Sequence, residues 1–386
     1  KPLEAETPGS CWMERWTSRN PFSFRIIAVS PTGEKEVLRI EKSGVGGYHN
    51  QLKWLMPAGT TSLRLESDTA AGGGVLLDDL TLMVGPMVVK GVKLHNPGVY
   101  PIMKRAVFNP ALAVEVDTVG AHDPKSVEKV VLKVSDPARV ARVTLRSGTE
   151  NGMDFSHSTA YGVGVPLADG TVVIKADAAL DGGTSRLWLD VTPAGSAPIG
   201  STVSFSGVKA TVDGKEYDLG DATVTQRIGT MLAFPGDAVG NQPNGADPRH
   251  CVAFRIPGMI RTASGALVAC FDARYHHEGD LCADIDVATV RSTDGGQSWT
   301  MPEVSMDAGP GHANGCGDPC ILQDPANGRI WMQSLVCHFS GGASLWTSKT
   351  GWDKDKTGQW GMVYSDDDGK TWCKDYVNPT RQIKKE

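Results

Sequence analysis

The stretch Ser-Thr-Asp-Gly-Gly-Gln-Ser-Trp occupies residues 292–299, and Ser-Asp-Asp-Asp-Gly-Lys-Thr-Trp occupies residues 365–372. Both stretches fit one pattern, Ser-x-Asp-x-Gly-x-Thr/Ser-Trp. Asp and Ser side chains bond to the local backbone of turns, and Gly permits a tight bend. We therefore expect each stretch to close a β-hairpin, with its Trp packed between neighbouring sheets. The repeat is a specific signal for a fold, and it assigns no function by itself.

Most of the remaining chain is typical of strands. Some segments alternate apolar and polar residues, and others are β-branched runs bounded by turn residues. Predicted strands of these two kinds include residues 62–66, 130–134, 171–174 and 186–191. The Asp-Gly pairs at residues 169–170 and 213–214 predict type I′ hairpins. Because no helical periodicity extends beyond two turns, the sequence predicts an all-β protein.

The composition argues against several classes of function. A formal net charge of −6 disfavours nucleic-acid binding, although a few local arginines can still bind an anion. The most apolar stretch, residues 75–89, contains two aspartates and is too short to span a membrane. The eight cysteines form no Cys-x-x-Cys motif, which disfavours zinc. We expect mostly free buried thiols, with a few disulfides as the alternative.

An arginine motif precedes the first repeat. Phe-Arg-Ile-Pro spans residues 254–257, Ala-Arg-Tyr spans residues 273–275, and Asp280 follows. The two repeats are Asp-boxes, which mark the hairpins of some β-propellers. In this order the motifs resemble the bacterial exo-α-sialidase (neuraminidase) family. The resemblance implies a six-bladed β-propeller and a retaining glycoside hydrolase that removes terminal sialic acid from glycans.

Three domains are predicted, since 386 residues exceed one small domain. Residues 1–88 resemble the C-terminal half of a jelly-roll carbohydrate-binding module, with a purely structural sandwich as the alternative. This domain could be incomplete. Residues 89–230 resemble a sialidase N-terminal β-sandwich, for glycan binding or for spacing. Residues 231–386 are expected to form the first blades of the propeller, roughly three at about 40 to 50 residues each.

The resemblance assigns the site residues. A planar guanidinium matches a carboxylate, and Arg255 is implied to bind the carboxylate on the anomeric carbon of sialic acid. Arg274 is implied to reach the substrate near that carboxylate and the 4-hydroxyl. Asp280 is implied to be the general acid/base, which protonates the leaving oxygen and then deprotonates water. Asp284 and Asp286 are alternatives, but their alternating strand favours structural roles.

Weaker assignments follow the same resemblance. Asp318, in Gly-Asp-Pro, resembles an aspartate that binds the 4-hydroxyl, and a turn aspartate is the alternative. Trp346 and Phe339 are expected in the wall of an N-acetyl pocket or in the core. His276 and His277 are expected to be solvated loop residues, since no spacing to a partner indicates a metal ligand or a base. Structural roles in the Asp-boxes are expected for Ser292, Asp294, Gly296, Trp299, Ser365, Asp367, Gly369 and Trp372.

The resemblance also implies a tyrosine nucleophile activated by a glutamate, since sialidases depart from the two-carboxylate scheme. Family members carry this pair and further arginines well past the second Asp-box. Only 131 residues follow Arg255 (386 − 255), and Tyr364, Tyr376 and Arg381 come too early. We therefore expect the pair in a C-terminal part of the same protein, with this chain alone inactive.

The predicted partners are sialylated glycans and glycoproteins, which imply a secreted, periplasmic or cell-surface protein. The resemblance implies no organic cofactor. The acidic turns leave a structural Ca²⁺ as an alternative, but no EF-hand-like spacing supports one, so no metal is expected. A trans-sialidase with the same residues stays an alternative. A non-catalytic, lectin-like sialoglycan-binding protein is another, although a pure binder has no use for a general acid.

Overall fold

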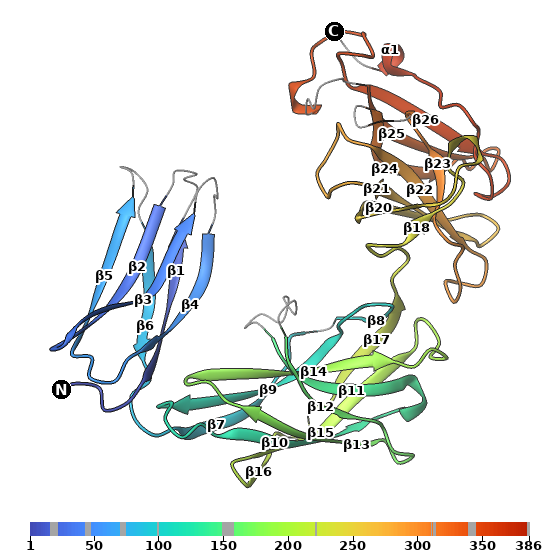
Figure 1. Cartoon of the computed structure of the whole chain (residues 1–386). Helices are drawn as coiled ribbons and strands as arrows, with labels where there is room; N and C mark the ends of the chain where they lie inside the picture. The colour runs from blue at the N-terminus through green and yellow to red at the C-terminus, as the bar shows by residue number, and fades with distance from the viewer. Residues whose placement is uncertain are drawn as a thin grey trace. The chain divides into compact units, whose positions relative to one another are not determined.

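The computed structural model describes residues 1–15, 22–42, 48–69, 75–98, 100–148, 158–220, 222–309, 311, 314–338 and 345–383. They form two compact units, Lys1–Gly229 and Thr230–Glu386. Regular structure is nearly all strand, as predicted (Figure 1). Within the described ranges the single α-helix is the short α1, Thr380–Ile383. No helix in this part of the chain is long and apolar enough to cross a bilayer.

The first six strands form a small sandwich of two three-stranded antiparallel sheets, which face each other in Figure 1. The sheet orders are β4-β1-β6 and β3-β2-β5. The strands are β1 Thr7–Arg15, β2 Phe22–Ser30, β3 Gly33–Lys42, β4 Tyr48–Met56, β5 Ser62–Thr69 and β6 Leu76–Leu82. Trp54 is buried in the core between the sheets, so it is a packing residue. The strand predicted at residues 62–66 lies in β5 and is confirmed.

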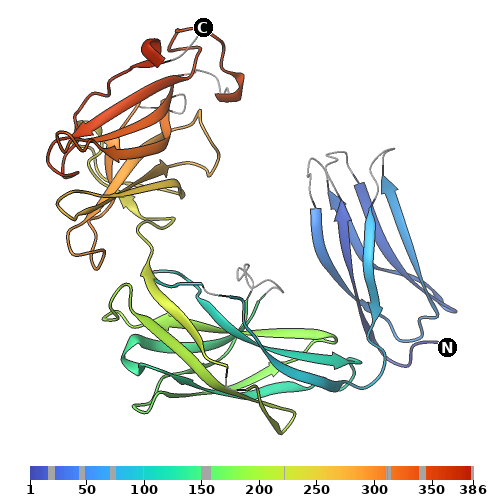
Figure 2. The same ribbon diagram turned by 180° about the vertical axis from the view of Figure 1, so that it is seen from behind.

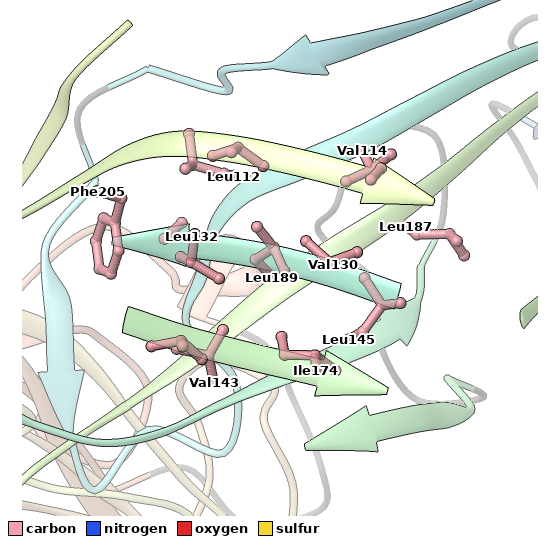
Figure 3. Close-up of a cluster of buried hydrophobic side chains, with 14 of the residues drawn as sticks. Leu112, Val114, Val130, Leu132, Val143, Leu145, Ile174, Leu187, Leu189 and Phe205 are labelled. Carbon is pink, nitrogen blue, oxygen red and sulfur yellow. The ribbon is translucent and has the colours of Figure 1, made fainter. Parts of the chain in front are cut away.

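A second sandwich, coloured cyan to yellow-green in Figure 2, contains the sheets β13-β10-β15-β17-β8, with β16 paired to β15, and β12-β11-β14-β9-β7. Its strands are β7 Val88–His95, β8 Ile102–Lys104, β9 Pro110–Val119, β10 Ser126–Val134, β11 Val140–Ser147, β12 Ala160–Gly164, β13 Thr171–Ala179, β14 Thr184–Pro193, β15 Thr202–Val212, β16 Lys215–Asp218 and β17 Val224–Thr230. Side chains such as Leu112, Leu132 and Leu189 fill its core (Figure 3). The strands predicted at residues 130–134, 171–174 and 186–191 are confirmed.

One of the two predicted type I′ hairpins is wrong. Asp213 and Gly214 have φ of 51° and 74° and connect the paired strands β15 and β16, as a type I′ turn requires. Gly170 has a positive φ of 81°, but Asp169 does not. The Asp169 carboxylate instead accepts hydrogen bonds from the backbone N–H and hydroxyl of Thr171. This turn joins β12 and β13, which belong to different sheets.

The second compact unit contains two antiparallel meanders, β20-β21-β22-β23 and β24-β25-β26, joined by a parallel pairing of Ile285 with Gly315. The strands are β18 Ala238–Val239, β19 Arg249–His250, β20 Ala253–Arg261, β21 Leu267–Arg274, β22 Ile285–Ser292, β23 Glu303–Met306, β24 Asn314–Gln323, β25 Ile330–His338 and β26 Gln359–Ser365. Successive meanders of this kind are blades of a β-propeller, the predicted fold. The described residues of this unit contain two such meanders, and the expectation of about three blades stays a prediction (Figure 1).

Both Asp-boxes close their hairpins with the same local bonds. Ser292 Oγ donates to Asp294 Oδ1 at 2.8 Å and accepts from the Gly296 N–H at 2.9 Å. Asp294 also accepts from the backbone N–H and hydroxyl of Ser298. The second turn repeats these bonds with Ser365, Asp367, Gly369 and Thr371. The bonds keep each tight turn closed at the end of a strand.

Removal of either serine hydroxyl is expected to destabilise the second unit. Ser292→Ala or Ser365→Ala leaves a buried glycine N–H without its acceptor, so the free energy of unfolding should fall by about 1–2 kcal/mol. Chemical denaturation measures this loss. Lys370→Ala is the control, because Lys370 is exposed and joins the turn through its backbone N–H. Unchanged stability in both serine variants would contradict the folding role of the repeat.

Candidate functional site

Strands β20 and β24 each contain a bulge before a proline. The register shifts within residues 255–258 of β20 and within residues 317–320 of β24. At the bulges, Ile256 and Asp318 have φ of 53° and 55°. A residue before proline rarely adopts this left-handed backbone conformation, and a β-branched residue such as isoleucine does so least often. Arg-Ile-Pro and Gly-Asp-Pro therefore form the same kind of bulge in successive blades. Bulges redirect neighbouring side chains.

The bulge in β20 brings Arg255 to the loop that carries Asp280. The Nη1 of Arg255 donates to the carbonyl oxygen of Glu278 and to Asp280 Oδ1, each at 3.2 Å. The Arg255 side chain is 47% exposed and that of Asp280 is 67% exposed. Two residues that the sequence places 25 positions apart therefore meet at the surface, where a ligand can reach both.

Arg274 lies behind this pair and is only 2% exposed. Its Nη1 donates to the carbonyl oxygens of Glu278 and Gly279 and, at 2.9 Å, to Asp280 Oδ1. Its Nε and Nη2 donate to Asp272 Oδ2 at 3.2 and 2.7 Å. Each nitrogen of the guanidinium thus has an acceptor within the protein. In this structure Arg274 holds the loop of Asp280 and offers little surface to a substrate.

Asp272 connects the site residues, although it is not among the candidates predicted from the sequence. Its side chain is 1% exposed, and its Oδ1 accepts from the backbone N–H of Asp318 at 2.9 Å. Burial raises the pKa of Asp272 to about 6, against the effect of Arg274. A signal was present, since Asp272 and Arg274 are two positions apart on one strand and share a face.

The weaker site candidates are only partly described. Asp318 is exposed at the β24 bulge, where its backbone N–H binds Asp272. Phe339 lies outside the described residues. Trp346 falls in the short helix η3, Leu345–Thr347, but its side chain is not among those described. The structure therefore brings together Arg255, Arg274, Asp280 and the backbone of Asp318.

The two tyrosines near the second Asp-box have contacts of their own. The Arg329 guanidinium lies 4.1 Å from the centre of the Tyr364 ring. The hydroxyl of Tyr376 is 2.9 Å from Nε2 of His338. Both contacts lie within the second blade and its final connection, consistent with packing roles.

Asp284 and Asp286 are both buried. Asp284 directly precedes β22, and Asp286 lies within that strand. Asp284 binds Arg249 at 2.6 Å and His276 at 3.1 Å, while the His276 side chain stays 45% exposed, as expected of a solvated loop residue. Burial raises the pKa of Asp284, but the bonds to Arg249 outweigh it and the net shift is downward. Asp286 Oδ2 accepts from the Tyr275 hydroxyl at 2.7 Å. Their burial favours the structural role that the strand pattern predicted.

The unfolding free energy of this unit is expected to fall between pH 5 and pH 8 because of Asp286. Burial and the nearby negative charge of Asp307 raise its pKa to about 8, from about 3.9 in an unfolded chain. Because the folded state holds this proton more tightly than the unfolded chain, Asp286 contributes its full stabilisation below about pH 4. The contribution to the free energy of unfolding is lost as the pH rises to about 8, at up to ~1.4 kcal/mol per pH unit.

Asp286→Asn tests this dependence of the free energy of unfolding on pH. The amide oxygen of the asparagine can still accept from Tyr275, but the side chain does not titrate. Denaturation of wild type and Asp286→Asn at pH 5 and pH 8 gives both slopes. The variant should show the flatter dependence on pH. Equal slopes would remove Asp286 as the cause.

None of the eight cysteines forms a disulfide, as predicted, and five are buried: Cys11, Cys251, Cys270, Cys316 and Cys337. Burial raises the pKa of Cys251 and of Cys270 to about 12, so both are thiols at neutral pH. In the part of the chain that the structure describes, no three His, Cys, Asp or Glu side chains come together in a way that could hold a metal ion.

Comparison with known proteins adds sequence and structural relatives. No family model matches the chain. The chain is 31% identical over 265 residues to a sialidase of Bacteroides fragilis (strain YCH46), a match that covers 66% of this chain and 46% of the relative. It is 30% identical over 128 residues to a sialidase of Paraclostridium sordellii, which covers 31% of this chain and 28% of that relative. The structure matches the Hadza microbial sialidase Hz136 with a TM-score of 0.61 and 26% identity, over 76% of this chain and 60% of the other. The chain thus spans less than half the length of these curated relatives.

Proposed function

We propose that this chain, which belongs to the bacterial sialidase family, carries part of the active site of a retaining exo-α-sialidase. The proposed reaction removes terminal sialic acid from glycoproteins and other glycoconjugates. One observation carries the proposal: the exposed Arg255 and Asp280 are in direct contact, with Nη1 and Oδ1 3.2 Å apart.

The chemistry of the substrate requires such a contact. In a sialoside, the carboxylate and the glycosidic oxygen are both attached to the anomeric carbon. A residue that binds the carboxylate must therefore stand beside the residue that protonates the glycosidic oxygen. Arg255 has the planar fork that pairs with a carboxylate, and Asp280 has a carboxyl group for proton transfer. Their contact supports this division of roles.

The ion pair also links substrate binding to the acid role. Asp280 Oδ1 accepts hydrogen bonds from both Arg255 and Arg274. A substrate carboxylate that binds Arg255 takes one of these donors and brings a second negative charge. Substrate binding at Arg255 would therefore change the hydrogen bonds of the proposed general acid.

Other assignments follow the family pattern. We assign Asp318 to the 4-hydroxyl, since its exposed side chain stands at the bulge beside the site. Arg274 contacts Asp280, and its burial favours a role in holding the loop of Asp280 over direct binding of the substrate. The proposed nucleophile is a tyrosine paired with a glutamate, as in the family, and we assign neither within this chain. Host-type glycan substrates imply a secreted, periplasmic or cell-surface enzyme.

Release of a fluorogenic aryl group from its α-sialoside tests the proposal. The assay compares the 386-residue chain with the longest natural form of the protein, and the same aryl group on β-galactose is the control. Sialoside-specific release by either form supports a sialidase. If neither form releases the aryl group but sialylated glycans still bind, the enzyme proposal is wrong and a lectin-like protein is favoured.

A further inference from the structure

Asp272 links three parts of the proposed site from beneath. Its Oδ2 accepts two hydrogen bonds from Arg274, whose Nη1 binds three acceptors in the loop of residues 278–280. Its Oδ1 accepts from the backbone of Asp318 in the neighbouring blade. In the register of β20 and β21, Asp272 is opposite Arg255. One buried carboxylate therefore touches or faces every described residue of the site except Asp280.

We propose that Asp272 is a positioning residue that sets the place of the Asp280 carboxyl group through Arg274. This inference rests on the proposed function. Asp272 has no route to a substrate, since its side chain is 1% exposed. It acts by fixing the buried guanidinium, which in turn orients the carbonyl oxygens of the loop and the Asp280 side chain.

The charges explain why a carboxylate is needed at this position. A buried arginine requires a counter-charge, and Asp272 and Asp280 both pair with Arg274. With Asp272 present, Arg274 is neutralised from within the sheet. Without it, Asp280 would be the one carboxylate among the described residues that still pairs with Arg274, so the position of the guanidinium and of Asp280 would no longer be fixed from within the sheet.

Asp272→Asn isolates this effect with little change in shape. The carboxylate accepts from Arg274 on Oδ2 and from Asp318 on Oδ1. An asparagine has one oxygen and one NH₂ group, so in either orientation a donor faces a donor. The variant therefore loses the counter-charge and one of the two connections.

The matched control is Asp286→Asn. Asp286 is a buried aspartate on β22, paired with Ala273, so it lies on the opposite face of the same sheet. This variant should keep wild-type turnover. Asp272→Asn should lower kcat by about 100-fold on sialosides with a sugar leaving group, as expected when a reacting group moves by about 1 Å. On aryl sialosides, whose leaving group needs little protonation, the loss should stay below about 10-fold.

A double-mutant cycle separates positioning from general damage. If Asp272 acts through Asp280, then Asp272→Asn in an Asp280→Ala background should cost less than about 3-fold, because coupled residues are not additive. Two independent losses that multiply, or equal losses on both substrate types, would overturn the proposal. Gly317→Ala is a milder second variant, since its Cβ would lie 3.2 and 3.3 Å from the two Asp272 oxygens. Gly317→Ala should also lower kcat more on sialosides with a sugar leaving group than on aryl sialosides, but by a smaller factor than Asp272→Asn.

Hydrogen exchange distinguishes this inference from the proposed function. In Asp272→Asn, the amides of residues 278–280 should exchange faster than in wild type, while Asp286→Asn leaves them unchanged. Faster exchange in a protein without sialidase activity would retain the positioning role and reject the sialidase. Unchanged exchange in a folded Asp272→Asn protein would reject the positioning role itself.

Discussion

Asp280→Ala should lower kcat/KM by about 10²- to 10⁴-fold on sialosides whose leaving group is another sugar. A sugar alkoxide is a poor leaving group, so the glycosidic oxygen must receive a proton as its bond breaks. An aryl leaving group needs little protonation, and for such substrates the loss should be much smaller. Parallel kinetics on both substrate types, with the form of the protein that turns them over, measure this difference.

Asp280→Asn should behave like the alanine variant, because an amide cannot donate the proton in the same way. Its matched control is Asp286→Asn, which makes the same change at a buried position on the neighbouring strand. Equal losses on aryl and sugar leaving groups would count against the acid role. They would indicate that Asp280 serves to hold Arg255 and Arg274 in place.

Arg255→Lys should raise KM by about 10- to 100-fold on both types of substrate, with a smaller change in kcat. A lysine keeps the positive charge but loses the planar fork that bonds a carboxylate in two places. Hydrogen bonds to charged groups contribute about 1.5–3 kcal/mol each, which corresponds to this range. Steady-state kinetics of wild type and variant give KM and kcat separately.

The control for this variant is Arg261→Lys, an exposed arginine at the far end of the same strand. It should leave KM unchanged. An unchanged KM in Arg255→Lys as well would remove Arg255 from the carboxylate site. A uniform loss of kcat without a change in KM would instead favour a role in the placement of Asp280.

Much of the fold could be predicted because its signals are local. Each Asp-box closes its turn with bonds between residues at most four positions apart. Strand alternation likewise depends on neighbours in the chain. The exception was Asp169-Gly170, which is a hairpin signal only when the strands on either side pair with each other. In the structure those strands belong to different sheets.

Local patterns of the chain predict the all-β class, and short motifs predict the Asp-box turns and the candidates Arg255 and Asp280. The support of the site depends instead on contacts between segments that are far apart in the chain. The bond from the Asp318 N–H to Asp272 spans 46 positions, and burial of Arg274 depends on packing that no local pattern records. A motif identifies which groups can react, whereas contacts between distant segments decide which group faces solvent and which one holds it in place.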